Sequence, residues 1–221
     1  MNWPETCLVC IPCLNESATI GGLVREIRRT LPRVLVIDDG SADNTAALAA
    51  TAGAAVTRHD RSLGKGRSLQ HAWAVAEQKG FEWVLTMDGD GQHAPSDISV
   101  LLSCAEASRA DLVIGNRMAQ AGRIPFVRRA VNRWMSRRLS RLAGVELPDT
   151  QSGFRLIRLE ALRGLRIAAT HFEIESEVLL RLARANRRIQ FVPIQVIYRA
   201  EQSKINPVLD TIRWLRWWRR A

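Results

Sequence analysis

Residues 84–93 read Val84-Leu85-Thr86-Met87-Asp88-Gly89-Asp90-Gly91-Gln92-His93. The apolar half of this segment predicts a short buried strand, and the strand ends at two carboxylates that are one residue apart. Carboxylate oxygens are good ligands for divalent cations, and ligands of open α/β sheets bind at the carboxyl ends of the strands. The segment therefore predicts an α/β fold with a site for a cation and nucleotide phosphates at one edge of the sheet.

The first half of the chain alternates short apolar runs with stretches of helical period, which predicts a mostly parallel central sheet flanked by helices. Polar pairs follow the strands: Asn15-Glu16 after the first, Asp38-Asp39 after the second, and Asp88 with Asp90 after the fourth. Turn residues and helix caps would explain any one of these pairs, but less well why the acids are doubled. Strands are expected near residues 8–12, 33–38, 54–57, 83–87 and 111–115, and helices near residues 17–30, 44–51, 64–79 and 95–107.

The second half of the chain is more basic. Residues 127–143 combine an apolar stripe with arginines on the other face, a pattern typical of an interfacial helix and also of an ordinary surface helix. A loop at 149–155 is expected to return to a short strand, and a helix at 172–185 and a strand at 190–196 are expected to follow.

The 221-residue chain is long enough for one sizeable core, and we expect one domain at 1–206 followed by a basic, tryptophan-rich tail at 207–221. The tail is expected to form a helix that either lies at the membrane interface or packs its tryptophans on the domain. With 32 basic and 22 acidic residues, the net charge is +10, which favours a phosphate-bearing or anionic-membrane partner.

The sequence also indicates what not to expect. It contains no nucleic-acid recognition motif, so no nucleic acid is expected as a partner. It contains neither a run of about 20 apolar residues that would span a membrane nor the pattern of a signal peptide. We therefore expect a cytoplasmic protein, and attachment to the inner face of the membrane stays open.

Three cysteines, Cys7, Cys10 and Cys13, form a Cys-x-x-Cys-x-x-Cys pattern that would suit a metal. They lie in an apolar run that reads as a buried strand, and side chains of a strand alternate between its faces. Cys10 should therefore point away from Cys7 and Cys13. We interpret all three as small core residues, without a disulfide.

The chain contains the following short motifs, in this order: Pro12-x-x-Asn15-Glu16, Asp38-Asp39-Gly40-Ser41, Gly64-x-Gly66, Asp88-x-Asp90-x-Gln92-His93, Gly115-x-Arg117, Gln151-Ser152-Gly153-Phe154-Arg155 and Ser203-Lys204. Together they resemble family 2 glycosyltransferases of the GT-A fold, and within that family the dolichyl-phosphate and polyprenyl-phosphate sugar transferases. The motifs occur in the family's order and cover almost the whole chain. The resemblance implies a single Rossmann-like GT-A domain with basic amphipathic helices in its C-terminal half.

The resemblance implies a metal-dependent, inverting transferase that takes a sugar from a UDP- or GDP-linked donor to a polyprenyl-phosphate or other lipid-linked acceptor. Mg²⁺ or Mn²⁺ would be bound by Asp88, Asp90 and Gln92, which offer oxygen ligands of the kind that these ions prefer. The other residues implied in donor binding are Pro12, Leu14, Glu16, Ile37 and Asp39 around the base and ribose, with Gly66, Asp88, Gly89 and Arg199.

The residues implied in catalysis are Asp90, Arg117, Arg128 and Lys204. The basic members of this group would contact donor or acceptor phosphates, which arginine does well by bidentate pairing. A phosphate acceptor is ionised at neutral pH and needs no general base, whereas an alcohol acceptor would need a carboxylate. Asp149 is the best candidate for such a base, and a structural turn is its more ordinary interpretation.

Other interpretations stay open. His93 could be a ligand or a base, although a structural loop histidine is the more ordinary interpretation. Gly64-Lys65-Gly66 resembles a phosphate-binding loop but lacks the full pattern of a P-loop kinase. The same fold could transfer a sugar to a hydroxyl of a glycan, lipid or small molecule, or it could be a catalytically degenerate binding or scaffold subunit.

Overall fold

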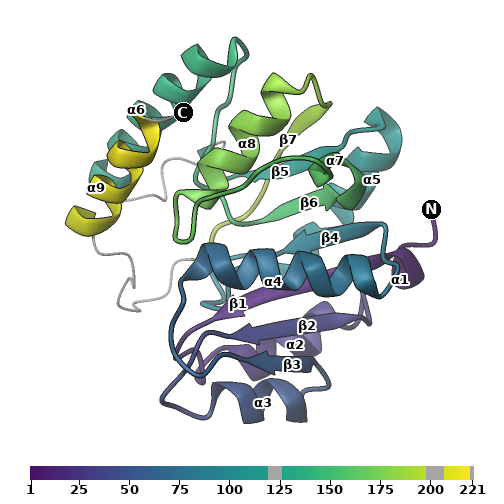
Figure 1. The fold of residues 1–221 in the computed structure, drawn as a ribbon. Helices are drawn as coiled ribbons and strands as arrows, with labels where there is room; N and C mark the ends of the chain where they lie inside the picture. Colours follow the sequence, from purple (N-terminus) through teal and green to yellow (C-terminus); the bar gives the residue numbers. More distant parts are fainter. Residues whose placement is uncertain (119–125, 198–206, 220–221) are drawn as a thin grey trace.

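The computed structural model describes residues 1–118, 126–197 and 207–219, and within these ranges it describes every side chain except those of Arg128 and residues 207–212. These ranges form a seven-stranded sheet between two layers of helices (Figure 1). The α/β fold class that the sequence predicted is confirmed.

The strand order is β3-β2-β1-β4-β6-β5-β7, and every neighbouring pair is parallel except the two pairs that include β6. The predicted mostly parallel sheet is therefore confirmed. The sequence indicated a short strand after residue 153 but not that it runs antiparallel between β4 and β5. The strands are β1 (Cys7–Cys13), β2 (Val34–Asp38), β3 (Ala55–Arg58), β4 (Trp83–Thr86), β5 (Leu112–Asn116), β6 (Arg155–Arg158) and β7 (Ile189–Pro193).

Two apolar clusters, one on each face of the sheet, form the core. The helices α2 (Ile20–Ile27), α3 (Thr45–Thr51) and α5 (Ile98–Ser108) cover one face. On the other face lie α4 (Lys65–Gln78), α7 (Leu159–Leu162) and α8 (Ile174–Arg184). The remaining helices are α1 (Trp3–Thr6), the 3-10 helix η1 (Pro95–Asp97), α6 (Phe126–Ala143), which packs on α8, and α9 (Pro207–Trp218).

The three cysteines of β1 alternate between the two core clusters, as the strand pattern predicted. Cys7 and Cys13 belong to the cluster under α2 and α5, whereas Cys10 belongs to the cluster under α4. Burial raises the pKa of the Cys7 and Cys10 thiols far above the ordinary value. Protonated thiols on opposite faces of a strand are core residues and do not share a metal.

The helix α9 lies alongside α6 (Figure 1). The Trp214 side chain is only 2% exposed, and its ring packs on Trp134 of α6 with centroids 5.5 Å apart. Its indole N–H donates to Ser176 Oγ of α8 at 3.0 Å. Of the two interpretations of the tail, packing on the domain is therefore present in the structure. Across the described ranges, none of the helices has both the length and the apolar character that crossing a membrane requires.

Candidate active site

The polar segments that follow β1 and β2 hold each other at the carboxyl edge of the sheet. The backbone N–H of Asn15 donates to Ser41 Oγ at 2.8 Å, and that of Glu16 donates to Thr45 Oγ1 at 2.8 Å. Because β1 is a parallel neighbour of both β2 and β4, the residues after all three strands reach the same edge. The structure thus brings the predicted polar pairs together.

Gly89 is the point where the segment after β4 meets the segment after β1. A Cβ atom on Gly89 would lie 2.6 Å from Cys13 Sγ and 3.2 Å from Glu16 Cγ, so only glycine fits there. The Gly89 carbonyl accepts a hydrogen bond of 2.6 Å from Thr19 Oγ1. The predicted residues Glu16 and Gly89 are therefore in close proximity, beside the two acids Asp88 and Asp90.

Asp90 is held next to Asp88 at a cost in electrostatic energy. Burial and the negative charge of Asp88 raise the pKa of Asp90 above its ordinary value, although the Gln92 N–H donates to its carboxylate at 3.0 Å. Among the described residues no group of three or more His, Cys, Asp and Glu side chains is arranged to hold a metal. Two carboxylates and the amide of Gln92 instead suit Mg²⁺ or Mn²⁺, which complete their shells with phosphate oxygens and water.

Lys65, the first residue of α4, neutralises part of this negative charge. Its Nζ lies 2.5 Å from Asp88 Oδ1 and 2.6 Å from Glu175 Oε1, and it also lies over the Phe172 ring. Burial alone would lower the pKa of Lys65, but the two carboxylates hold it above the ordinary value. Gly153 permits the approach, because a Cβ there would lie 2.6 Å from Asp88 Oδ2 and 2.9 Å from the lysine Nζ.

Lys65 was indicated only as part of the Gly64-Lys65-Gly66 segment, which resembles a phosphate-binding loop, and its pairing with two acidic side chains was not predicted. Glu175 was not predicted as a site residue. Gly66 lies where α4 meets the loop before α8, since a Cβ on Gly66 would lie 2.6 Å from the carbonyl carbon of Thr170. Nothing in the local sequence distinguishes Glu175 from the surface acids of an ordinary helix, although it is only 5% exposed.

The His93 side chain is buried and contacts other residues of the domain. Its side chain is 3% exposed, its ring stacks on Phe154 with centroids 5.2 Å apart, and its Nδ1 accepts a hydrogen bond of 3.4 Å from the Asp88 N–H. Burial lowers the pKa of His93 despite the two neighbouring carboxylates. A neutral, buried ring that fixes the backbone of Asp88 matches the loop interpretation of this histidine.

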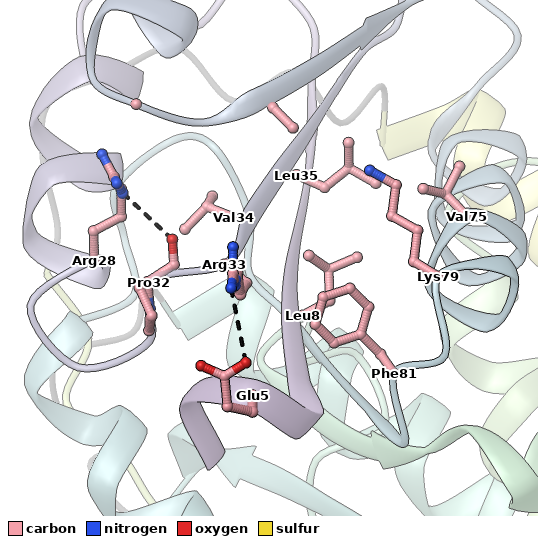
Figure 2. Close-up of a pocket in the computed structure, with 12 residues that line it drawn as sticks. Glu5, Leu8, Arg28, Pro32, Arg33, Val34, Leu35, Val75, Lys79 and Phe81 are labelled. Carbon is pink, nitrogen blue, oxygen red and sulfur yellow. Dashed lines mark hydrogen bonds and ion pairs between the residues drawn. The ribbon is translucent and has the colours of Figure 1, made fainter. Parts of the chain in front are cut away.

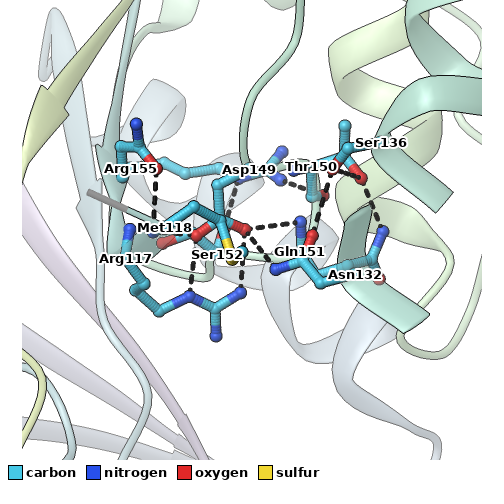
Figure 3. Close-up of polar contacts among 10 residues, drawn as sticks. Arg117, Met118, Asn132, Ser136, Asp149, Thr150, Gln151, Ser152 and Arg155 are labelled. Atoms are coloured by element: carbon cyan, nitrogen blue, oxygen red, sulfur yellow. Dashed lines mark hydrogen bonds and ion pairs between the residues drawn. The ribbon is translucent and has the colours of Figure 1, made fainter. Parts of the chain in front are cut away.

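Arg117 and Asp149 form a bidentate ion pair (Figure 3). The arginine Nε and NH2 donate to Oδ2 and Oδ1 of Asp149, both at 2.9 Å, and the Arg117 backbone N–H donates to Oδ2 at 3.0 Å. Asn132 Nδ2 of α6 donates to Oδ1 at 2.9 Å. Burial would raise the pKa of Asp149, but Arg117 and these donors lower it to about 2. A fully buried carboxylate with these partners is not available as a general base, so the turn interpretation of Asp149 holds.

The polar network around Asp149 continues toward the C-terminal helix. The Thr150 N–H donates to Ser136 Oγ at 3.2 Å, and the hydroxyls of the two residues are hydrogen-bonded at 3.2 Å (Figure 3). Gln151 Nε2 donates to Thr150 Oγ1 at 2.9 Å and to Ser176 Oγ at 3.0 Å. Ser176 also accepts from the indole of Trp214. Arg155, the first residue of β6, donates through its guanidinium to the carbonyls of Ser152, Thr150 and Glu175. Arg117 is thus positioned by a rigid, buried network.

The remaining predicted site residues have varied environments. Ile37 lies in the core with 0% of its side chain exposed, so that side chain presents no surface to a ligand. Pro12 pairs with it across β1 and β2, and Leu14 follows at the partly exposed carboxyl edge. The side chain of Arg128 and the whole of Arg199 and Lys204 lie outside the described residues.

A cavity of about 510 Å³ lies at the opposite edge of the sheet, where β1, β2 and β3 begin (Figure 2). Leu8, Leu35 and Phe81 form part of its apolar wall, and Arg33, one of its basic residues, makes an exposed 3.7 Å ion pair with Glu5. Ligands of open α/β sheets bind at the carboxyl ends of the strands. This cavity is therefore not the candidate active site, and the carboxyl edge beside Asp88 and Asp90 remains the candidate.

Solved structures of the same fold are glycosyltransferases. The chain superposes with a TM-score of 0.71 on glucosyl-3-phosphoglycerate synthase from Mycobacterium tuberculosis in complex with Mn²⁺, UDP-glucose and phosphoglyceric acid. The sequences are 23% identical, and the match covers 93% of this chain and 74% of the synthase. The chain therefore has the GT-A fold.

The family model described as "Glycosyl transferase family 2" matches residues 8–166. The polyprenol monophosphomannose synthase of Mycolicibacterium smegmatis is 33% identical over 175 residues, which are 73% of this chain and 65% of that protein. The undecaprenyl-phosphate mannosyltransferase of Micrococcus luteus is 29% identical over 228 residues, 94% of this chain and 93% of that protein. The chain belongs to glycosyl transferase family 2, and the resemblance to polyprenyl-phosphate sugar transferases is confirmed.

Proposed function

We propose that this chain transfers a sugar from a nucleotide-sugar donor to a polyprenyl phosphate, with inversion at the anomeric carbon and with Mg²⁺ or Mn²⁺ bound by Asp88, Asp90 and Gln92. The observation that carries the proposal is the acidic pair after β4, in which burial and the charge of Asp88 raise the pKa of Asp90. A cation beside Asp90 would relieve this repulsion. The bound metal would neutralise the departing diphosphate.

The names of the similar proteins support this choice of donor, metal and acceptor. The synthase of the same fold holds Mn²⁺ together with UDP-glucose. The two relatives are named for transfer to polyprenol and undecaprenyl phosphate. For the donor we propose contacts along the ends of β1 and β4, from Pro12, Leu14, Glu16 and Gly89, and at the start of α4, from Gly66.

The environment of Asp149 favours a phosphate acceptor over an alcohol acceptor. In the proposed reaction an oxygen of the acceptor phosphate attacks the anomeric carbon as the bond from that carbon to the diphosphate oxygen breaks. The electron pair of this bond leaves with the nucleoside diphosphate, and no proton has to be removed from the acceptor. Asp149, the best candidate for a base, is instead fully buried against Arg117. We propose that Arg117, Arg128, Arg199 and Lys204 hold the donor and acceptor phosphates.

The test is a donor and acceptor screen that measures release of the nucleoside diphosphate. UDP- and GDP-sugars are offered with Mn²⁺ or Mg²⁺, and each with polyprenyl phosphate, with the matched polyprenol or without acceptor. Release that requires both a divalent cation and the phosphorylated lipid is expected. Equal release with polyprenol would instead assign a hydroxyl acceptor, and failure of every donor to bind or react would refute the enzyme assignment.

We also propose that the first turns of α6 contact an anionic membrane, where the lipid acceptor resides. Phe126 and Val127 are 73% and 71% exposed, which is unusual for large apolar side chains at the start of a helix. Arg129 and Arg133 lie on the same helix, and arginine beside exposed aromatic groups is typical of the membrane interface.

A further inference from the structure

Gln151 connects the Arg117 ion pair to a helix that lies behind it. The Gln151 backbone N–H donates to Asp149 Oδ1 at 3.2 Å, and the same carboxylate holds Arg117 (Figure 3). The Gln151 side-chain amide donates to Ser176 Oγ of α8 at 3.0 Å. One residue therefore joins α8 to the carboxylate that orients the arginine.

The Ser176 hydroxyl is shared with the C-terminal helix. Its oxygen accepts from Gln151 and also, at 3.0 Å, from the indole N–H of Trp214 on α9. Ser176 is 0% exposed and Trp214 is 2% exposed, so water does not replace either donor in the folded chain. A buried donor that loses its acceptor is strongly disfavoured. The positions of α9 and of Gln151 are therefore linked by two buried hydrogen bonds to one oxygen.

Aromatic and cationic contacts hold α9 on α6. The Trp214 ring packs on Trp134 of α6, and Arg138 Cζ of α6 lies 5.5 Å from the ring centroids of both Trp134 and Trp218. Stacking and cation–π contacts are individually weak. Elements near a chain end that are held by weak contacts open locally before the whole domain unfolds. Docking of α9 is thus a local equilibrium that Ser176 senses through the indole.

Arg117 has donors left for a second anion. Asp149 takes the Nε–H and one of the two NH2 hydrogens, whereas a guanidinium carries five N–H groups. The Arg117 side chain is 24% exposed and Asp149 is 0% exposed, so the pair presents only its cationic half to a ligand. The direction in which the remaining N–H groups point is set by the buried carboxylate.

We propose that Gln151 is a positioning residue, which makes the orientation of Arg117 depend on the docking of α9. This inference rests on the proposed function, in which Arg117 holds a phosphate. With the indole in place, Ser176 and Gln151 complete the set of donors around Asp149. Without the indole, the Gln151 side chain loses its fixed partner, and the N–H that it places on Asp149 moves with it. The last helix thereby contributes to phosphate binding without touching the phosphate.

The experiment follows the Arg117 Nε–H by nitrogen-15 NMR in Gln151→Met and Trp214→Phe. The first change keeps the side-chain length and removes the amide, and the second keeps a ring and removes the indole N–H. The net effect of one hydrogen bond is about fivefold in an equilibrium constant, so the Arg117 Nε–H should exchange about fivefold faster in each variant, with a shifted resonance.

The matched control is Trp3→Phe. It also removes a buried indole donor, which bonds to Glu106 Oε1 at 2.8 Å on a different part of the domain. This variant should leave the exchange and the resonance of the Arg117 Nε–H unchanged. Equal acceleration in the control would mean that the Nε–H reports the stability of the whole domain, and it would overturn the inference.

The double variant tests whether Gln151 and Trp214 act through the same connection. It should be no worse than Gln151→Met alone, because both changes interrupt one chain of hydrogen bonds, and fully additive effects would overturn that connection. In turnover, the KM for polyprenyl phosphate should rise while the KM for the nucleotide sugar stays unchanged. An unchanged Arg117 Nε–H in both single variants would also overturn the inference, and Trp214→Phe alone decides should Gln151→Met fail to fold. The NMR readout needs no turnover, so a failed donor screen would refute the proposed function and leave this connection standing.

Discussion

Replacing Asp149 by asparagine removes the charge that fixes Arg117. The pKa of Asp149 falls from an ordinary 3.8 to about 2, because Arg117 and the other donors outweigh the effect of burial. One pKa unit is worth about 1.4 kcal/mol, so the charge contributes roughly 2–3 kcal/mol to the free energy of unfolding at neutral pH. For a chain of this size the variant should lose about 5–10 °C in Tm.

The measurement is thermal and urea unfolding of the two proteins from pH 7 to pH 2. Because the pKa of Asp149 is lowered by folding, its contribution is complete above about pH 4 and is lost as the pH falls toward 2. The stabilities of the parent and Asp149→Asn should therefore converge in acid.

The control is Glu160→Gln, which removes a charge from an ion pair whose side chains are 60% and 47% exposed. Exposed pairs contribute little, so this variant should melt like the parent. A stability difference between parent and Asp149→Asn that stays constant from pH 7 to pH 2 would refute the electrostatic account of the pair. So would a loss below about 0.5 kcal/mol at pH 7.

Three further variants test the site and the proposed membrane surface. Asp90→Ala should abolish nucleoside diphosphate release and leave the Tm unchanged or higher, because it relieves the repulsion with Asp88; full turnover would contradict the metal assignment. Gly153→Ala should weaken Mn²⁺ binding about tenfold while the domain still folds, because its Cβ would lie 2.6 Å from Asp88 Oδ2 and displace that carboxylate; unchanged affinity by titration calorimetry would mean that the carboxylate adapts freely. The double variant Phe126→Ser and Val127→Ser should sediment less with vesicles that contain anionic lipid. The control Leu48→Ser changes a side chain that is 39% exposed on the distant helix α3, and it should sediment like the parent. Equal sedimentation of all variants would exclude the start of α6 as the membrane surface.

The sequence predicted those parts of the fold that depend on local patterns. The apolar runs ending at Asp38 and at Asp88 are strands in the structure, and the acids that follow them reach one edge because the strands are parallel. The position of β6 could not be predicted in the same way. Its four residues, Arg155–Arg158, pair with β4 and β5 through contacts that are distant in the sequence.

The sequence predicted site residues that directly follow the end of a strand. It did not predict which side chains these residues contact in the folded chain. Asp39 and Asp149 were both identified as candidate functional acids. Nothing in the neighbouring sequence indicated that Asp39 accepts hydrogen bonds from residues 59–64 or that Asp149 pairs with Arg117. Asp88 and Glu175, which are distant in the sequence, both pair with Lys65 only in the folded chain.

The place of β6 in the sheet bears on how the chain folds. Strands β1 to β4 can pair as their segments form. Strand β5 is not hydrogen-bonded to β4 and joins these strands only through β6, in which Arg158 pairs with Trp83 of β4. Residues 87–154 separate β4 from β6, and closing so long a loop is slow. Until it closes, the edge of β4 that faces away from β1 lacks its neighbouring strand. Since Asp88 follows β4, and Gly153 beside Asp88 precedes β6, the acidic pair should acquire its final geometry late in folding.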